Sequence, residues 1–182
     1  MSTKLWPIVL AVAGVTTVVV AALFFTGAFA GTGQLAVAVH DAPCAECSQV
    51  WVTFTSVAVH ESDLSGNGWT TLNVSGATVD LMALNGSAFA KVIDVASLKT
   101  GHYEQVRLTV SHVAVVLVGG SNVTASLPDA TSADVNGAFS VTSGATTTLS
   151  IDLDLATSLH VTGAGATLNA TFTPNIGSVV VT

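Results

Sequence analysis

Residues 146–155 read TTTLSIDLDL, and this stretch decides the fold class. From position 149 onward every second residue is leucine or isoleucine, and Ser150, Asp152 and Asp154 stand between them. A two-residue apolar period is typical of a β-strand with one buried face, because successive side chains point to opposite sides of a sheet. We therefore expect a strand whose apolar face packs on a core and whose polar face meets water or a polar neighbour.

Similar runs, rich in β-branched residues, recur along the chain between short polar breaks. Glycine, asparagine and serine dominate these breaks, as they do in turns. Together they predict an all-β protein, an antiparallel β-sandwich over 31–182, with at most a helical turn near Asp80–Leu84 or Ala90–Leu98. The other expected strands are 34–40, 50–60, 102–110, 112–118 and 167–173, and the expected turns are 65–68, 100–101, 119–122, 136–137, 143–144 and 163–165.

The chain before the predicted sandwich has a different character. Residues 5–30 (LWPIVLAVAGVTTVVVAALFFTGAFA) carry no charge and exceed the roughly 20 residues that span a bilayer as a helix. Ala28-Phe29-Ala30 before Gly31 has the form of a signal-peptidase site, whereas the length of the run favours a retained anchor. Both interpretations predict one apolar helix within residues 1–30 and an extracellular domain from Gly31 onward, which is anchored in the membrane through residues 5–30 if the segment is retained and secreted if it is cleaved.

Charge is scarce in the sequence. Four Lys and Arg stand against eleven Asp and Glu, and charged residues make up 8% of the 182-residue chain while hydrophobic residues make up 50%. High hydrophobicity with low charge excludes a disordered chain. The shortage of cations excludes nucleic-acid binding, which depends on neutralising backbone phosphates.

Cys44-Ala45-Glu46-Cys47 holds the two cysteines of the chain. Thioredoxin-like chemistry places such a pair at the start of a helix, whereas a strand-like segment follows here. A structural zinc site needs four ligands, which only scattered histidines complete. We favour a disulfide between Cys44 and Cys47 in an oxidising compartment.

The histidines of the chain come at strand ends or within strands. His40 and His60 are the candidates for a mixed site with the two cysteines, but no HxH or HxxxH pair is present. The favoured interpretation has no metal and no cofactor. No calcium-binding loop of recognised spacing occurs either, so Asp152 and Asp154 are expected to form a solvated face or to pair with Arg107, the one arginine of the chain.

Four asparagines begin N-glycosylation sequons that no proline blocks: Asn73, Asn85, Asn122 and Asn169. If they are used, glycans supply the surface hydration that the few charges do not. Trp51 and Trp69 are compatible with a sugar-stacking platform, although core packing is the commoner role of tryptophan. No GxSxG or HExxH motif occurs, and we expect no enzymatic activity.

The order and spacing of several segments resemble an exported bacterial and archaeal family catalogued as domain of unknown function 4382. The similarity covers most of 33–172. The resemblance implies an immunoglobulin-like or transthyretin-like β-sandwich without established activity, and framework roles for Asp41, His60, Arg107, Asp152 and His160. The chain departs from the family pattern in its Cys44/Cys47 loop and in an N-terminal apolar segment that lacks a lipobox cysteine. The segments that carry the resemblance are 35–43 (LAVAVHDAP), 50–60 (VWVTFTSVAVH), Trp69, 78–81 (TVDL), 101–108 (GHYEQVRL), 147–155 (TTLSIDLDL) and 158–160 (SLH).

These features favour a non-enzymatic structural or adhesion module on the cell surface, glycosylated and held by its N-terminal helix. One alternative is a subunit of a pilus-like filament, built from like subunits through a helical core or through donation of the C-terminal strand 175–182. The plainer interpretation of that tail is the last strand of the domain itself. The other alternative is an exported metal- or carbohydrate-binding domain.

Overall fold

A computed structural model describes residues 31–42, 44–62, 68–84, 91–128 and 131–182. The predicted helix within residues 1–30 lies outside the described residues. Thr32–Thr182 form one unit, which is mostly β-structure, so the all-β prediction is confirmed. In the described part of the chain, no helix is long and apolar enough to cross a membrane.

Eleven strands and three short helical segments follow one another in the described residues. They are β1 (Thr32–Ala42), β2 (Cys47–Glu61), β3 (Trp69–Asp80), η1 (Leu81–Leu84), β4 (Lys91–Lys99), β5 (Gly101–Leu117), β6 (Asn122–Thr124), β7 (Ser132–Val141), β8 (Thr146–Asp154), α2 (Leu155–Ser158), β9 (Leu159–Thr162), η3 (Gly165–Thr167), β10 (Asn169–Phe172) and β11 (Ile176–Val181).

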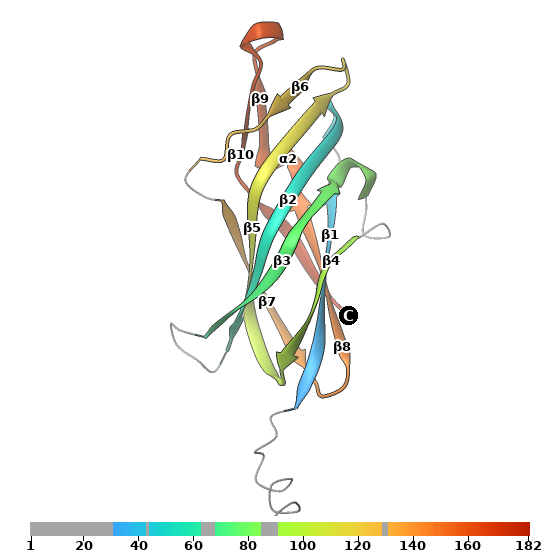
Figure 1. Ribbon diagram of the computed structural model, residues 1–182, viewed down its shortest axis with the longest axis vertical. Coiled ribbons are helices and arrows are strands. Elements are labelled where there is room, and N and C mark those ends of the chain that lie inside the picture. Colours follow the sequence, from blue (N-terminus) through green and yellow to red (C-terminus); the bar gives the residue numbers. More distant parts are fainter. Residues whose placement is uncertain (1–30, 43, 63–67, 85–90, 129–130) are drawn as a thin grey trace, which may run out of the picture. The chain divides into compact units, whose positions relative to one another are not determined.

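The strands form two main sheets and one hairpin (Figure 1). Sheet A has the order β11-β8-β1-β4. Sheet B has the order β3-β2-β5-β6, and β7 also pairs with β5. The hairpin joins β9 to β10, and Thr171 of β10 forms an isolated β-bridge with Ser126, which lies between β6 and β7.

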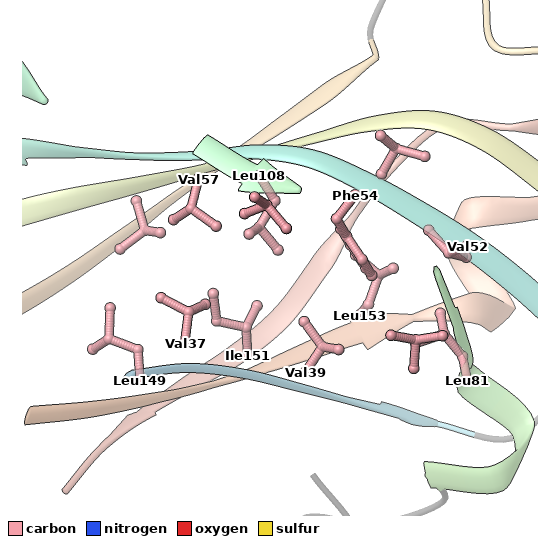
Figure 2. Close-up of a cluster of buried hydrophobic side chains, with 14 of the residues drawn as sticks. Val37, Val39, Val52, Phe54, Val57, Leu81, Leu108, Leu149, Ile151 and Leu153 are labelled. Atoms are coloured by element: carbon pink, nitrogen blue, oxygen red, sulfur yellow. The ribbon is translucent and has the colours of Figure 1, made fainter. Parts of the chain in front are cut away.

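The core lies between the two sheets. Val37 and Val39 of β1 and Ile151 of β8 face Phe54 and Val57 of β2 (Figure 2), and all five side chains are fully buried. The alternation in 146–155 therefore has the predicted cause: its apolar face packs against sheet B. Burial of this continuous apolar layer is the main stabilising contribution to the fold.

Sheet A is mixed rather than purely antiparallel, which corrects part of the prediction. β1 pairs with β8 in parallel, with Gln34 opposite Thr146 and His40 opposite Asp152. The two strands are about a hundred residues apart in the sequence, so no tight turn imposes an antiparallel arrangement on them. The C-terminal strand β11 pairs with β8 of the same chain, as in the plainer interpretation of the tail.

Several local predictions are corrected as well. The runs 102–110 and 112–118 form the single long strand β5, whose register against β2 shifts near Thr53 and Phe54. The predicted turn at 136–137 lies inside β7, and residues 91–99 form β4 rather than a helical turn. The helical turn near 80–84 is confirmed as η1.

Candidate functional site

A disulfide joins Cys44 and Cys47, as predicted, with a distance of 5.3 Å between their Cα atoms. The amide of Cys47 also donates a hydrogen bond to the carbonyl of Cys44. Cys47 begins β2 and is buried in the core, whereas Ala45 and Glu46 are exposed. The bond therefore fixes an exposed two-residue tip onto the start of a central strand.

This loop forms one side of an open groove with a volume of about 450 Å³. Such a volume is within the usual range for ligand sites. In Figure 1 the neighbouring elements α2 and β9 lie toward the end of the domain away from the start of β1. The groove is lined by Cys44, Ala45, Glu46, Leu155, Ala156, Leu159, His160, Val161 and Thr162.

Short-range hydrogen bonds set the far wall of the groove. The Asp154 carboxylate accepts hydrogen bonds from the amides of Ala156 and Thr157, which caps the single turn α2. The amide of Leu159 donates to the carbonyl of Leu155, so the chain leaves α2 in an extended conformation as β9. Asp154 thus acts as a helix cap rather than as a partner of Arg107.

Most residues that line the groove are apolar, and its two ionisable side chains are Glu46 and His160. Both side chains are exposed, and neither makes a hydrogen bond or ion pair with another described residue. His160 is one of the framework positions that the resemblance implied. The arrangement offers a binding surface with one acidic group.

A second polar cluster lies on the outer face of sheet B. The Nε and Nη2 atoms of Arg107 each donate a 2.6 Å hydrogen bond to the Asp134 carboxylate. The guanidinium also stacks on Trp69, with its Cζ atom 4.4 Å from the ring centroid. The partner of Arg107 is therefore Asp134, whereas the sequence had suggested Asp152 or Asp154, which belong to sheet A.

Hydrogen bonding to Arg107 lowers the pKa of Asp134 below its ordinary value of 3.8. A carboxyl group whose pKa is lower in the folded state stabilises the fold above its unfolded pKa and loses this contribution as the pH falls. We expect the loss to begin below about pH 4 and to stay under about 1 kcal/mol, because both side chains are 40% or more exposed.

Acid denaturation of the unmodified chain and of Asp134→Asn, followed by circular dichroism, measures this contribution. The variant should be less stable at neutral pH, and the difference between the two proteins should shrink toward pH 2. A difference that stays constant with pH would contradict the assignment.

The candidate metal ligands are not brought together. His40 lies on β1 of sheet A and His60 on β2 of sheet B, and both alternate with core-facing valines, so they occupy opposite outer faces of the sandwich. Both cysteines are bonded to each other. The mixed site of His40, His60 and the cysteines is therefore wrong, and the described residues hold no other group of three or more His, Cys, Asp or Glu suited to a metal.

Each of these histidines instead lies beside a carboxylate of its own sheet. The Nδ1 atom of His40 is 3.6 Å from Asp152 Oδ1, and that of His60 is 3.3 Å from Glu104 Oε1. Neither contact has the geometry of a hydrogen bond, and His40 Nε2, Ser150 Oγ, Asp152 Oδ1 and His60 Nδ1 are buried without a hydrogen-bond partner in the described residues. His60 also packs edge-on against Trp69, with 5.1 Å between the ring centroids.

The two tryptophans do not form one platform. Trp51 and Trp69 lie on the outer face of sheet B, but Trp51 pairs with Asp80 whereas Trp69 pairs with His60. Nine residues of β2 separate the two positions, which is about 30 Å at roughly 3.3 Å per residue. Trp69 is already stacked by Arg107, so a joint sugar-stacking role is excluded for this pair.

The sequons differ in their setting. Asn122 begins β6, Asn169 begins β10, and both residues are exposed. Asn73 lies within the edge strand β3, and Asn85 lies outside the described residues. Asn122 and Asn169 therefore have the surface positions that a glycan requires.

Comparison with known proteins gives one family. The sequence model described as "Domain of unknown function (DUF4382)" matches residues 32–170, most of the chain, and confirms the suspected resemblance. No curated protein and no solved structure matches the chain.

Proposed function

The chain belongs to the domain of unknown function 4382 family, and from this membership and the Cys44–Cys47 disulfide we propose that it is a non-enzymatic structural or adhesion module of the cell surface. The disulfide carries the proposal, because such bonds persist in oxidising compartments outside the cytosol. It also stabilises one side of the groove, which makes the groove the part of the surface best suited to contact a partner.

The arrangement along the chain supports an anchored module. The apolar residues 5–30 end just before β1 begins at Thr32, and this segment is long enough to hold the domain at a membrane. Within the domain, the elements α2 and β9, which supply part of the groove lining, lie toward the end away from the start of β1 (Figure 1). Retention of residues 5–30 would therefore make the protein a membrane-anchored module.

Glycans at Asn122 and Asn169 would add hydration to a surface with few charges. For the fold we propose a variant of the immunoglobulin-like or transthyretin-like sandwich. Its support is the packing of two sheets whose neighbouring strands are often far apart in sequence, as in β8-β1 and β2-β5.

Labelling of intact cells tests this proposal. A membrane-impermeant amine reagent should label the native protein on whole cells, and its cysteines should resist alkylation until a reductant is added. Glycosidase treatment should increase its electrophoretic mobility if the sequons are used. Labelling that occurs only after lysis, together with free thiols in the native protein, would overturn the proposal.

A further inference from the structure

The strand that borders the groove pairs on one side only. β9 pairs with β10, with His160 opposite Thr171 and Thr162 opposite Asn169. On its other side, β10 bonds Ser126, which donates to the carbonyl of Ala170 and accepts from the amide of Phe172. No further strand pairs with β9 among the described residues, so β9 is the free edge of this small sheet.

Strand alternation shows which backbone groups of β9 face the groove. Ala170 and Phe172 direct their backbone groups toward Ser126. The residues that alternate with them, Asn169 and Thr171, therefore direct their backbone groups toward β9. His160 and Thr162 therefore bond with β10, and Val161 presents its amide and carbonyl on the opposite side. Neither group of Val161 has a hydrogen-bond partner in the described part of the chain.

The groove beside this edge matches an extended chain. Residues 159–162 line it continuously, which gives an edge of about 13 Å at roughly 3.3 Å per residue. The apolar side chains of Leu159 and Val161 lie along it, and the disulfide loop faces them. A strand added here would form hydrogen bonds with Val161 and place alternate side chains on the same side as Leu159 and Val161.

The negative charge of the groove lining indicates which kind of extended peptide segment would bind. Glu46 is the acidic residue of the groove lining, and the whole chain has a formal net charge of −7. A basic side chain opposite Glu46 is therefore favoured over an acidic one.

We propose that the groove between β9 and the Cys44–Cys47 loop binds an extended, apolar peptide segment with a basic residue by adding it as a strand to the edge of β9. The proposal that such a peptide is the partner of a surface module rests on the proposed function. The binding itself is measured independently of where the protein resides.

The test is a titration of the full chain in detergent micelles with the capped peptide Thr-Val-Lys-Val-Thr, followed by amide signals in NMR. Signals of Glu46, Leu159 and Val161 should shift and saturate. The same peptide N-methylated at both valines keeps its side chains but cannot donate their backbone hydrogen bonds, and it should bind about tenfold more weakly. A Thr-Val-Glu-Val-Thr peptide should also bind more weakly, and Glu46→Lys should reverse this preference.

Val161→Pro removes the exposed amide donor, and proline is tolerated on edge strands whose N–H faces solvent. It should weaken binding about tenfold, whereas the matched control Val161→Thr keeps the donor and should bind normally. The N-methylated peptide preserves the test if Val161→Pro does not fold, because it uses the unmodified chain.

The inference would be overturned if the N-methylated peptide bound as tightly as the unmodified peptide, or if the peptide shifted only signals of residues outside the groove. It would also be overturned if an N-acetylglucosamine hexamer, and not the peptide, shifted the groove signals. The proposed function fails separately, in the labelling of intact cells.

Discussion

Replacing Phe54 with alanine is expected to lower the free energy of unfolding by about 3–5 kcal/mol, the largest effect of any single truncation that we predict. The side chain is fully buried on β2, in the middle of the layer between the two sheets (Figure 2). Its removal deletes apolar area that folding withdraws from water and leaves a cavity lined by side chains such as Leu153 and Val39, which strand pairing holds in place.

Urea unfolding of the full chain in micelles, followed by tryptophan fluorescence and circular dichroism, measures this effect. Thr55→Ala is the matched control: Thr55 is the next residue of β2 but is exposed, and we expect a change of at most about 0.5 kcal/mol. Similar losses for the two variants would mean that Phe54 does not pack in the core.

The sequence predicted the strands with long apolar or cleanly alternating runs, and missed β3, β4 and β7, whose apolar residues are fewer or are interrupted by polar residues and glycine. Residues 146–155 alternate cleanly because β8 lies in the interior of sheet A with one face against sheet B. β4 is an edge strand whose Val92 and Val95 are about half exposed, so its apolar residues follow no clear period. In β7 the pair Asn136-Gly137 resembles a turn, but β5 pairs with this segment and keeps it extended.

The candidate site was predicted only in its separate parts. The spacing of Cys44 and Cys47 indicated the disulfide, and the family resemblance drew attention to His160. Their meeting in one groove depends on the non-local pairing of β1 with β8, which places the end of β8 near the start of β2. Likewise, the Arg107 partner was sought at Asp152 and Asp154, since Asp134 lies in β7, a strand that the sequence did not indicate.

The start of β1 should be nearly as sensitive as the core, although it carries no large side chain. Gly33 is buried against the turn between β7 and β8, and a Cβ atom there would lie 2.3 Å from the carbonyl oxygen of Thr142 and 2.7 Å from a methyl group of Val141. The obstacle is mainly backbone, so a small rotation of a side chain cannot relieve it. Hydrogen bonds from Gln34 to Ala145 and from Gly144 to Thr32 hold the same two segments together.

Gly33→Ala is therefore expected to lower the free energy of unfolding by about 2–4 kcal/mol, because it adds overpacking to the loss of one or both hydrogen bonds. Gly119→Ala is the control, because a Cβ atom at Gly119 meets nothing within 4 Å and the φ angle of Gly119 is not positive. This substitution should change the free energy of unfolding by no more than about 0.5 kcal/mol. Urea unfolding compares the two, and equal stability would show that the start of β1 is free to move away from the turn. A large loss at Gly33 alone would instead mean that β1 is held firmly against this turn from its second residue.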